Sequence, residues 1–519
     1  MILALEKLLK TPNRHHNLKW LIREIKSLDR HNAISFLQKA DLFIYGYNGI
    51  NIGKSSDDTH GLMVKILIPY LLDKVISFSD GRKIIYFDVP HLHNMSVSYN
   101  KNSHVLFSSL YNCASNITKI FFSDEIVSIA KIMLPLNKEQ MKIQQNNTHS
   151  FNRFYNIFAQ EDSISQEFEK QFGIDLHQVS ILSWALFAYI QENVFGDEKV
   201  GFKKEDFVSF THTLRNISHE DKEKFLNFIS LSPKDYKAYY LMDRKDSDGK
   251  LYSYEEQEYF DRALPKVSYQ FPLIKESNIY YPISLTSFFY FMRMERFYRI
   301  MTHEIKGFKG SISGPRIETH IRELMQRYLD TSSTNGNVSG DARYYPFGKS
   351  KPKDEPDAIL ETDNYVLFVE SKSSAFNLKL YREMKETHIL RLIENIKKSL
   401  KNIDLYCDYH KERLKGKKIL KIISFYEEDT TTMELLLNNI SKHITNEEYL
   451  LLGIDDLHRY LIPNNNSLDN IYTSYLQVRP THTTNFEFFM HKQGVEEKSL
   501  FGDVHYLKDL AEKFHLPHK

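Results

Sequence analysis

The chain has very little cysteine: Cys113 and Cys407 are its only two thiols among 519 residues. Two distant thiols provide neither a disulfide framework nor a cysteine-ligated zinc site, so we expect a reducing, cytoplasmic location. Long apolar runs are missing too, and none reaches the roughly 18 residues that span a bilayer. The first stretch, MILALEKLLKTPNRHH, carries acids and bases early, so we expect no signal peptide and no membrane partner.

A strong net charge, internal repeats and a nucleotide-binding fingerprint are also absent. The formal net charge is +1, so the chain as a whole is not a polycation, and any surface for nucleic acid must be local. The glycine-rich stretch Leu42–Ser56 lacks the first glycine of a phosphate-binding loop, because that position is Asn48. With 42% hydrophobic residues, the sequence is typical of a soluble globular protein of two or three domains.

The residue pattern changes near position 300. Residues 1–300 show mainly helical patterns, such as the apolar stretch Leu176–Phe195, and we expect a domain for regulation, recognition or oligomerisation. Residues 301–465 alternate between helix and strand patterns, which predicts a compact α/β sandwich with a mixed sheet. Residues 466–519 form a C-terminal extension with no readable role. The fold class is therefore α/β, or α+β for the whole chain.

Individual elements of the second domain follow from local patterns. A helix that begins near Pro315 is expected to bury one face, formed by Ile317, Ile321, Leu324 and Tyr328. Residues 331–341 read as a loop. We expect strands and helices over the following ranges: strands at 342–348, 357–361, 365–371, 418–426 and 449–453, and helices at 380–406 and 431–444.

Three charged residues occur where the two central strands should be buried. Asp357 begins the first strand, and Glu370 and Lys372 share one face at the end of the second, because side chains alternate along a strand. A turn at 362–364 brings Asp357 beside them. Such charges are costly unless they are paired or bind a metal. Two carboxylates suit Mg²⁺, and a lysine there can orient or deprotonate a water or stabilise developing charge.

This arrangement resembles a known signature. Pro356-Asp357, followed after a strand-length gap by Glu370-Ser371-Lys372, is similar to the motif of the PD-(D/E)xK nuclease superfamily, which has the restriction-endonuclease-like fold. The resemblance covers about residues 305–465. It implies that Asp357 and Glu370 are the principal metal ligands, with Mg²⁺ as cofactor and Mn²⁺ able to substitute. It also implies a catalytic role for Lys372, an accessory ligand at Glu318 and a main-chain ligand at Ser371.

Members of that superfamily often add a Gln, Tyr or His from the helix after the lysine. No glutamine stands at the expected depth here, and this role stays open among several polar residues of the helix: Tyr381, His388, Arg391, Glu394 and Asn395.

The segment that follows the motif is basic. Between Phe376 and Phe425 there are 13 Lys and Arg residues against 6 Asp and Glu residues, an excess that attracts phosphate. The alternative interpretation is a solvated helix followed by a basic turn. We predict nucleic-acid contacts from four residues of the helix: Lys379, Arg382, Lys385 and Arg391.

The sequence thus predicts a metal-dependent nuclease that hydrolyses phosphodiester bonds, with DNA favoured over RNA. An unregulated nuclease would damage its own cell, so we expect control by residues 1–300, by a homo-oligomer or by a regulatory protein partner. Restriction-like and antiphage defence proteins are organised in this way, an analogy of fold alone. The alternatives are a module that binds nucleic acid without cutting it, an assembly protein, and a merely structural hairpin in which Glu370 pairs with Lys372.

Overall fold

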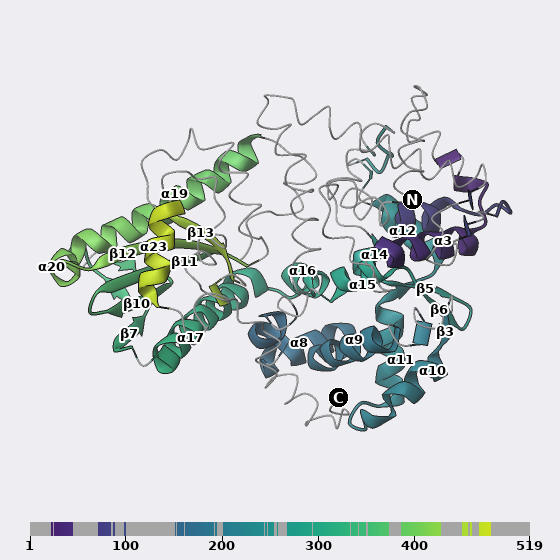
Figure 1. Ribbon diagram of the computed structural model, residues 1–519, viewed down its shortest axis with the longest axis horizontal. Coiled ribbons are helices and arrows are strands. Elements are labelled where there is room, and N and C mark those ends of the chain that lie inside the picture. Colours follow the sequence, from purple (N-terminus) through teal and green to yellow (C-terminus); the bar gives the residue numbers. More distant parts are fainter. Residues whose placement is uncertain are drawn as a thin grey trace. The chain divides into compact units, whose positions relative to one another are not determined.

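The computed structural model describes a little over half of the chain. The described ranges, several with short internal gaps, are 22–44, 71–84, 87–88, 98–99, 151–194, 201–253, 257, 267–348, 351–372, 386–426, 449–458 and 467–478. The chain divides into a first unit, Met1–Ser123 with Ser165–Arg296 and Lys508–Lys519, and a second unit, Asp124–Ile164 with Phe297–Leu507. Both units contain helices and a mixed sheet, which confirms the mixed α/β class (Figure 1).

The first unit contains a four-stranded sheet in the order β3-β6-β5-β4, with β4 and β5 parallel and the other pairs antiparallel. The apolar stretch from Leu176 forms helix α9, which buries most of its length and confirms the predicted buried helix. Its elements are α3 (Arg30–Ile44), β1 (Phe87–Asp88), β2 (Ser98–Tyr99), α8 (Asp162–Phe172), α9 (Leu176–Ile190), β3 (Phe202–Lys203), α10 (Lys204–Phe210), η3 (Thr211–Thr213), α11 (His219–Phe228), β4 (Ser230–Leu231), α12 (Pro233–Met242), α14 (Val267–Gln270), β5 (Leu273–Glu276), β6 (Ile279–Pro282) and α15 (Leu285–Phe291).

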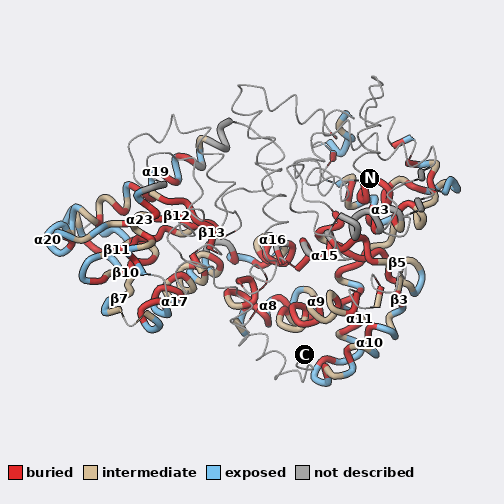
Figure 2. Tube along the Cα trace, in the orientation of Figure 1, coloured by how far each residue is buried: buried red, intermediate tan, exposed pale blue. Residues whose placement is uncertain are grey.

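The second unit contains a five-stranded sheet in the order β13-β12-β11-β10-β7. The pairs β7–β10 and β10–β11 are antiparallel, whereas β11–β12 and β12–β13 are parallel, so this sheet is mixed. Figure 2 shows its central strands buried. The strands of this unit are β7 (Gly336–Ser339), β8 (Arg343–Tyr344), β9 (Lys353–Asp354), β10 (Ala358–Thr362), β11 (Tyr365–Lys372), β12 (Lys418–Phe425) and β13 (Leu450–Gly453).

Helices pack on this sheet. Tyr406 of α19 lies in one apolar cluster with Ile359 of β10 and Phe368 of β11. Helix α17 contacts β7, β10 and β11. The hydroxyl of its Tyr328 accepts a hydrogen bond from the amide of Leu468, the first residue of α23 (3.1 Å). The helices of this unit are η1 (Tyr155–Ala159), α16 (Glu295–Glu304), η4 (Phe308–Ser313), α17 (Gly314–Ser332), α19 (Glu386–Tyr409), α20 (Lys411–Leu414) and α23 (Leu468–Val478).

Several local predictions for this unit are confirmed. Helix α17 begins at Gly314 and buries the predicted face, which contains Ile317, Ile321, Leu324 and Tyr328. The two central strands, β10 and β11, lie within one residue of their predicted bounds. The predicted strands at 418–426 and 449–453 are also present, as β12 and β13. Of the predicted helices, residues 380–385 and 431–444 lie outside the described residues.

Two predictions next to the central strands are wrong. The expected loop at 331–341 contains β7, whose sequence Gly-Asn-Val-Ser has little intrinsic strand preference and is ordered by pairing with β10 at the edge of the sheet. The expected strand at 342–348 is only two residues long, because the chain turns at Pro346 after β8. In the part of the chain that the structure describes, no helix combines the length and the apolar character needed to cross a membrane.

Candidate active site

Asp357 precedes β10 by one residue and lies opposite the end of β11. Its Oδ2 accepts two hydrogen bonds from Ser371, one from the backbone amide (2.6 Å) and one from the hydroxyl (3.0 Å). Its carbonyl oxygen accepts a hydrogen bond from Nη1 of Arg322 on α17 (2.8 Å). The carboxylate is therefore oriented by β11, and the backbone that carries it is held by α17.

Glu370 and Lys372 meet at the end of β11, as their two-residue spacing predicted. Glu370 is only 7% exposed, whereas the Lys372 side chain keeps 26% of its surface exposed. Nζ of Lys372 donates to Oε2 of Glu370 at 3.4 Å. The other carboxylate oxygen, Oε1, accepts a hydrogen bond from Nδ2 of Asn402 on α19 (3.0 Å). Glu370 is thus held between its own strand and the helix that covers it.

The charge of Glu370 affects the neighbouring carboxyl group of Asp357. Burial, and then the negative charge of Glu370, raise the pKa of Asp357 to about 6 from its ordinary value of 3.8. The charge of Lys372 and the two hydrogen bonds from Ser371 act in the opposite direction on this pKa and only partly offset the rise. A cation placed between the carboxylates would relieve this repulsion, so the pair is suited to bind one.

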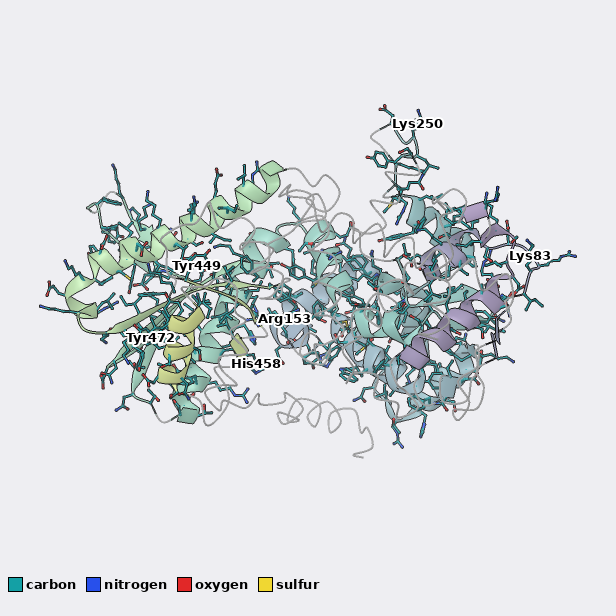
Figure 3. All side chains as sticks on the ribbon, turned by 45° about the horizontal axis from the view of Figure 1, so that its top comes forward. Lys83, Arg153, Lys250, Tyr449, His458 and Tyr472 are labelled. Atoms are coloured by element: carbon teal, nitrogen blue, oxygen red, sulfur yellow. The ribbon has the colours of Figure 1, made fainter. Side chains whose placement is uncertain are left out.

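The end of β11 is anchored by the residue that follows β12. The amide of Tyr426 donates to the carbonyl oxygen of Lys372 at 3.0 Å. The Tyr426 ring packs against the rings of Tyr298 (centroids 4.6 Å apart) and Phe158 (5.5 Å), and the guanidinium of Arg153, labelled in Figure 3, lies 4.7 Å from its centroid. The backbone of the predicted catalytic lysine is therefore fixed by an aromatic cluster within the second unit.

A glycine allows a close approach to Asp357. Gly340 follows β7 with φ +147°, and a Cβ atom at this position would lie 2.5 Å from the carbonyl oxygen of Asp357. No side chain fits at that distance, so the backbone of β7 can pass the site only because this residue is glycine.

Glu318 is not among the residues that meet at the end of β11. It lies on α17, partly buried, one turn before Arg322, and residues four apart share a helix face. Within the described residues, no three His, Cys, Asp or Glu side chains form a group that could hold a metal. The structure therefore brings together Asp357, Glu370, Ser371 and Lys372, while the role of Glu318 as a ligand stays a prediction.

Of the four predicted nucleic-acid contacts, only Arg391 can be placed. It is exposed on α19. Lys379, Arg382 and Lys385 lie outside the described residues.

The sequence prediction did not include Asn402. Its candidate helix residues ended at Asn395, whereas α19 continues to Tyr409 and places Asn402 against Glu370. The helical period could have predicted this position. Asn402 precedes Tyr406 by four positions and therefore lies on the same helix face, and Tyr406 packs on the sheet.

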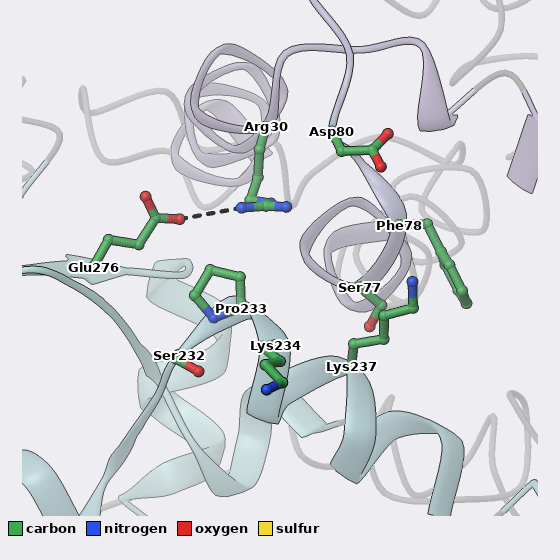
Figure 4. Close-up of a pocket in the computed structure, with 9 residues that line it drawn as sticks. All are labelled: Arg30, Ser77, Phe78, Asp80, Ser232, Pro233, Lys234, Lys237 and Glu276. Atoms are coloured by element: carbon green, nitrogen blue, oxygen red, sulfur yellow. Dashed lines mark hydrogen bonds and ion pairs between the residues drawn. The ribbon is translucent and has the colours of Figure 1, made fainter.

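The first unit has a pocket of its own, with a volume of about 450 Å³ (Figure 4). Charges of both signs line it, and Arg30 is already paired with Glu276 at 3.3 Å. Lys237 lies with its Nζ 5.4 Å from the ring centroid of Phe78. Its two carboxylates, Asp80 and Glu276, lie on opposite sides of the pocket in Figure 4, and Glu276 is already paired with Arg30, so this lining does not compete with the site in the second unit.

Comparisons with protein-family models, with curated proteins and with solved structures find no match for this chain.

Proposed function

We propose that this chain is a metal-dependent nuclease that hydrolyses phosphodiester bonds, with DNA favoured as substrate. The observation that carries the proposal is the convergence of Asp357, Glu370 and Lys372 at one end of β11, where Glu370 is almost fully buried. A carboxyl group with a raised pKa, such as Asp357, is found more often at functional sites than elsewhere.

A merely structural role explains this arrangement less well. In the described part of the chain, the carboxylate of Asp357 accepts hydrogen bonds from Ser371 and forms no ion pair with an arginine or lysine. It lies close enough to Glu370 for that charge to raise its pKa. Two carboxylates beside each other lower the stability of a folded protein, so their presence favours a function that requires them.

The order of elements agrees with the proposal. Helix α17, the antiparallel strands β10 and β11, helix α19 and the parallel strand β12 follow one another along the chain. We propose that this part of the second unit is a restriction-endonuclease-like sandwich, the fold that the PD-(D/E)xK resemblance implies.

The oxygen donors suit a hard divalent cation. Mg²⁺ in proteins is commonly held by one or two carboxylates together with waters and substrate phosphate, so Asp357 and Glu370 are sufficient protein ligands. The carbonyl of Ser371 and the carboxylate of Glu318 are proposed as accessory donors. When bound, Mg²⁺ or Mn²⁺ makes a water more acidic and offsets charge on the phosphoryl group.

Three residues of the chain have separate roles in the proposed reaction. Asn402 keeps one oxygen of Glu370 in place, and Ser371 does the same for Asp357. The ammonium group of Lys372 lies next to both the carboxylates and the solvent, where it can orient the attacking water and stabilise negative charge on the phosphoryl oxygens. The oxygen of water forms a new bond to phosphorus while one ester P–O bond breaks, which leaves a phosphate monoester and a free hydroxyl.

We propose that this activity is restrained until it is needed, in a restriction-like or antiphage defence role. The first unit, a homo-oligomer or a regulatory protein partner would supply the restraint. The support is chemical: an unrestrained nuclease would attack the nucleic acid of its own cell.

The test is cleavage of plasmid DNA and of DNA and RNA oligonucleotides in Mg²⁺, in Mn²⁺ and in EDTA. We expect the wild type to cut only with a divalent metal, and the variants Lys372→Ala and Glu370→Ala to lose at least about 100-fold in rate. Lys170→Ala, which replaces an exposed lysine of the first unit, should cut like the wild type. Robust cleavage by Lys372→Ala would reject the assignment. Binding without cleavage under every metal would identify a non-cutting module instead.

A further inference from the structure

Exposed aromatic side chains of the second unit gather at the β8–β9 hairpin. Tyr345 is 44% exposed and Phe347 58% exposed, both on the connection between the two strands. Tyr409, at the end of α19, is 50% exposed, and its ring lies 5.3 Å from that of Tyr344 at the base of the hairpin. No other aromatic side chain among the described residues has as large an exposed fraction as these three. Exposed apolar surface concentrated in one place indicates a surface that a ligand covers.

A hydrogen-bonded turn follows β8. The amide of Gly348 donates to the carbonyl oxygen of Tyr345 (3.3 Å), which closes a turn with Pro346 at its second position. The amide of Lys351 in turn donates to the carbonyl oxygen of Gly348 (3.1 Å), whose φ of +89° favours glycine. The turn from Tyr345 to Gly348 holds the backbone that carries both rings, which reduces the conformational entropy lost when they bind a ligand.

The same hairpin is basic. Arg343, Lys351 and Lys353 are all exposed, and Arg343 pairs with Asp354 at 3.6 Å. Within the described ranges, neither Lys351 nor Lys353 forms an ion pair with an acidic residue. Aromatic rings followed by positive charges on one hairpin match a strand of unpaired nucleotides, whose bases stack on the rings while its phosphates contact the charges.

The hairpin is also tied to the candidate active site. Strand β9 ends at Asp354, three residues before Asp357, which is about 10 Å of extended chain. The ring of Tyr344 packs on that of Tyr406 (5.3 Å), which packs in turn on Phe368 of β11 (5.7 Å). A strand held by the hairpin is therefore kept within a few nucleotides of the site.

We propose that the described residues of this hairpin, 343–348 and 351–354, bind the unpaired bases of the strand that is cut. Tyr345 and Phe347 stack on bases, and Lys351 and Lys353 contact the phosphates. The inference rests on the proposed nuclease function and adds a substrate class to it: single-stranded nucleic acid, or a duplex with an unpaired segment. A fully paired duplex does not offer base faces to these rings, because each base is already stacked on its neighbours.

Equilibrium binding in EDTA tests this inference without cleavage. Fluorescence anisotropy would compare single-stranded DNA, single-stranded RNA and a blunt DNA duplex, all labelled and of matched sequence. We expect the double variant Tyr345→Ala with Phe347→Ala to lose at least about tenfold in affinity for unpaired DNA or RNA, and much less for the duplex. The conservative pair Tyr345→Phe with Phe347→Tyr should restore binding. Leu476→Ala, which removes an exposed apolar side chain of α23, should bind all three like the wild type.

The outcomes separate the two proposals. Unchanged affinity of the double variant for both single strands would overturn the inference, as would an equal loss on single strands and duplex. If the double variant loses affinity for only one of the two single strands, that strand shows whether the hairpin accepts deoxyribose or ribose. Metal-dependent hydrolysis of bis(4-nitrophenyl) phosphate by the wild type tests the proposed function by itself, since this diester has no strand that could occupy the site and the hairpin together. Circular dichroism of each variant confirms that it is folded.

Discussion

Nδ2 of Asn402 lies 3.0 Å from Oε1 of Glu370, and this hydrogen bond links helix α19 to the end of strand β11. The two residues are 32 positions apart in sequence. Lys372 contacts the other oxygen of the same carboxylate, so the contacts from Asn402 and Lys372 together fix the orientation of Glu370. The orientation of one candidate metal ligand therefore depends on a helix that lies outside the motif.

Asn402→Ala removes this orientation. We expect a loss of about 10- to 100-fold in metal-dependent kcat/KM, because groups that orient metal ligands typically have effects of this size. Titration with Mn²⁺ should show weaker metal activation as well. Asn395→Ala is the matched control, because Asn395 is exposed on the same helix. Equal activity of the two variants would show that the bond has no functional role.

Gly340→Ala should disturb Asp357 through the backbone. The added Cβ would meet the carbonyl oxygen of Asp357 at 2.5 Å, so β7 or Asp357 must move, and both activity and thermal stability should fall. Gly416→Ala is the control, since φ there is +81° and a Cβ would meet nothing within 4 Å. We expect the control to cost about 1 kcal/mol of stability and to keep its activity. Similar activity losses in both variants would contradict the close-approach argument.

The raised pKa of Asp357 predicts a pH dependence of stability in the metal-free protein. Between pH 3.8 and about 6 the folded state holds a proton that the unfolded state has lost, so the free energy of unfolding falls as pH rises through this range. The fall is about 3 kcal/mol, and above pH 6 this contribution is constant. Urea unfolding at a series of pH values in EDTA measures it.

Asp357→Asn should remove this slope, because no carboxyl group then titrates at the position. Asp363→Asn, at the exposed turn between the same two strands, should keep it. Added Mg²⁺ should stabilise the wild type more at pH 7 than at pH 5, since a metal binds the ionised carboxylate. A slope that persists in Asp357→Asn would assign the pH dependence to another group.

Arg391→Ala should weaken nucleic-acid binding through charge alone. Arg391 is exposed on α19, and one lost phosphate contact lowers the slope of log K against log salt by about 1. Affinity measured for one DNA at several NaCl concentrations gives this slope. Lys170→Ala serves as the control, because that exposed lysine lies in the first unit and pairs with Glu167. Identical slopes for Arg391→Ala and the wild type would exclude a phosphate contact at this residue.

Local patterns in the sequence were enough to predict α17, the strands β10 and β11, and the meeting of Glu370 with Lys372. Side chains repeat every 3.6 residues along the helix and every 2.0 residues along the strands, and both patterns involve only residues that are close in sequence. The edge strand β7 was missed, because Gly-Asn-Val-Ser becomes a strand only by pairing with β10.

The sequence by itself determined which charged residues share a strand face, because the alternation of side chains is a property of a single strand. Only the tertiary structure decided that Asn402 holds Glu370, that Gly340 passes close to Asp357, and that the hairpin rings stay exposed. Each of these features joins segments that are distant along the chain. Such contacts depend on how the sheet pairs and how the helices pack on it, which no local pattern encodes.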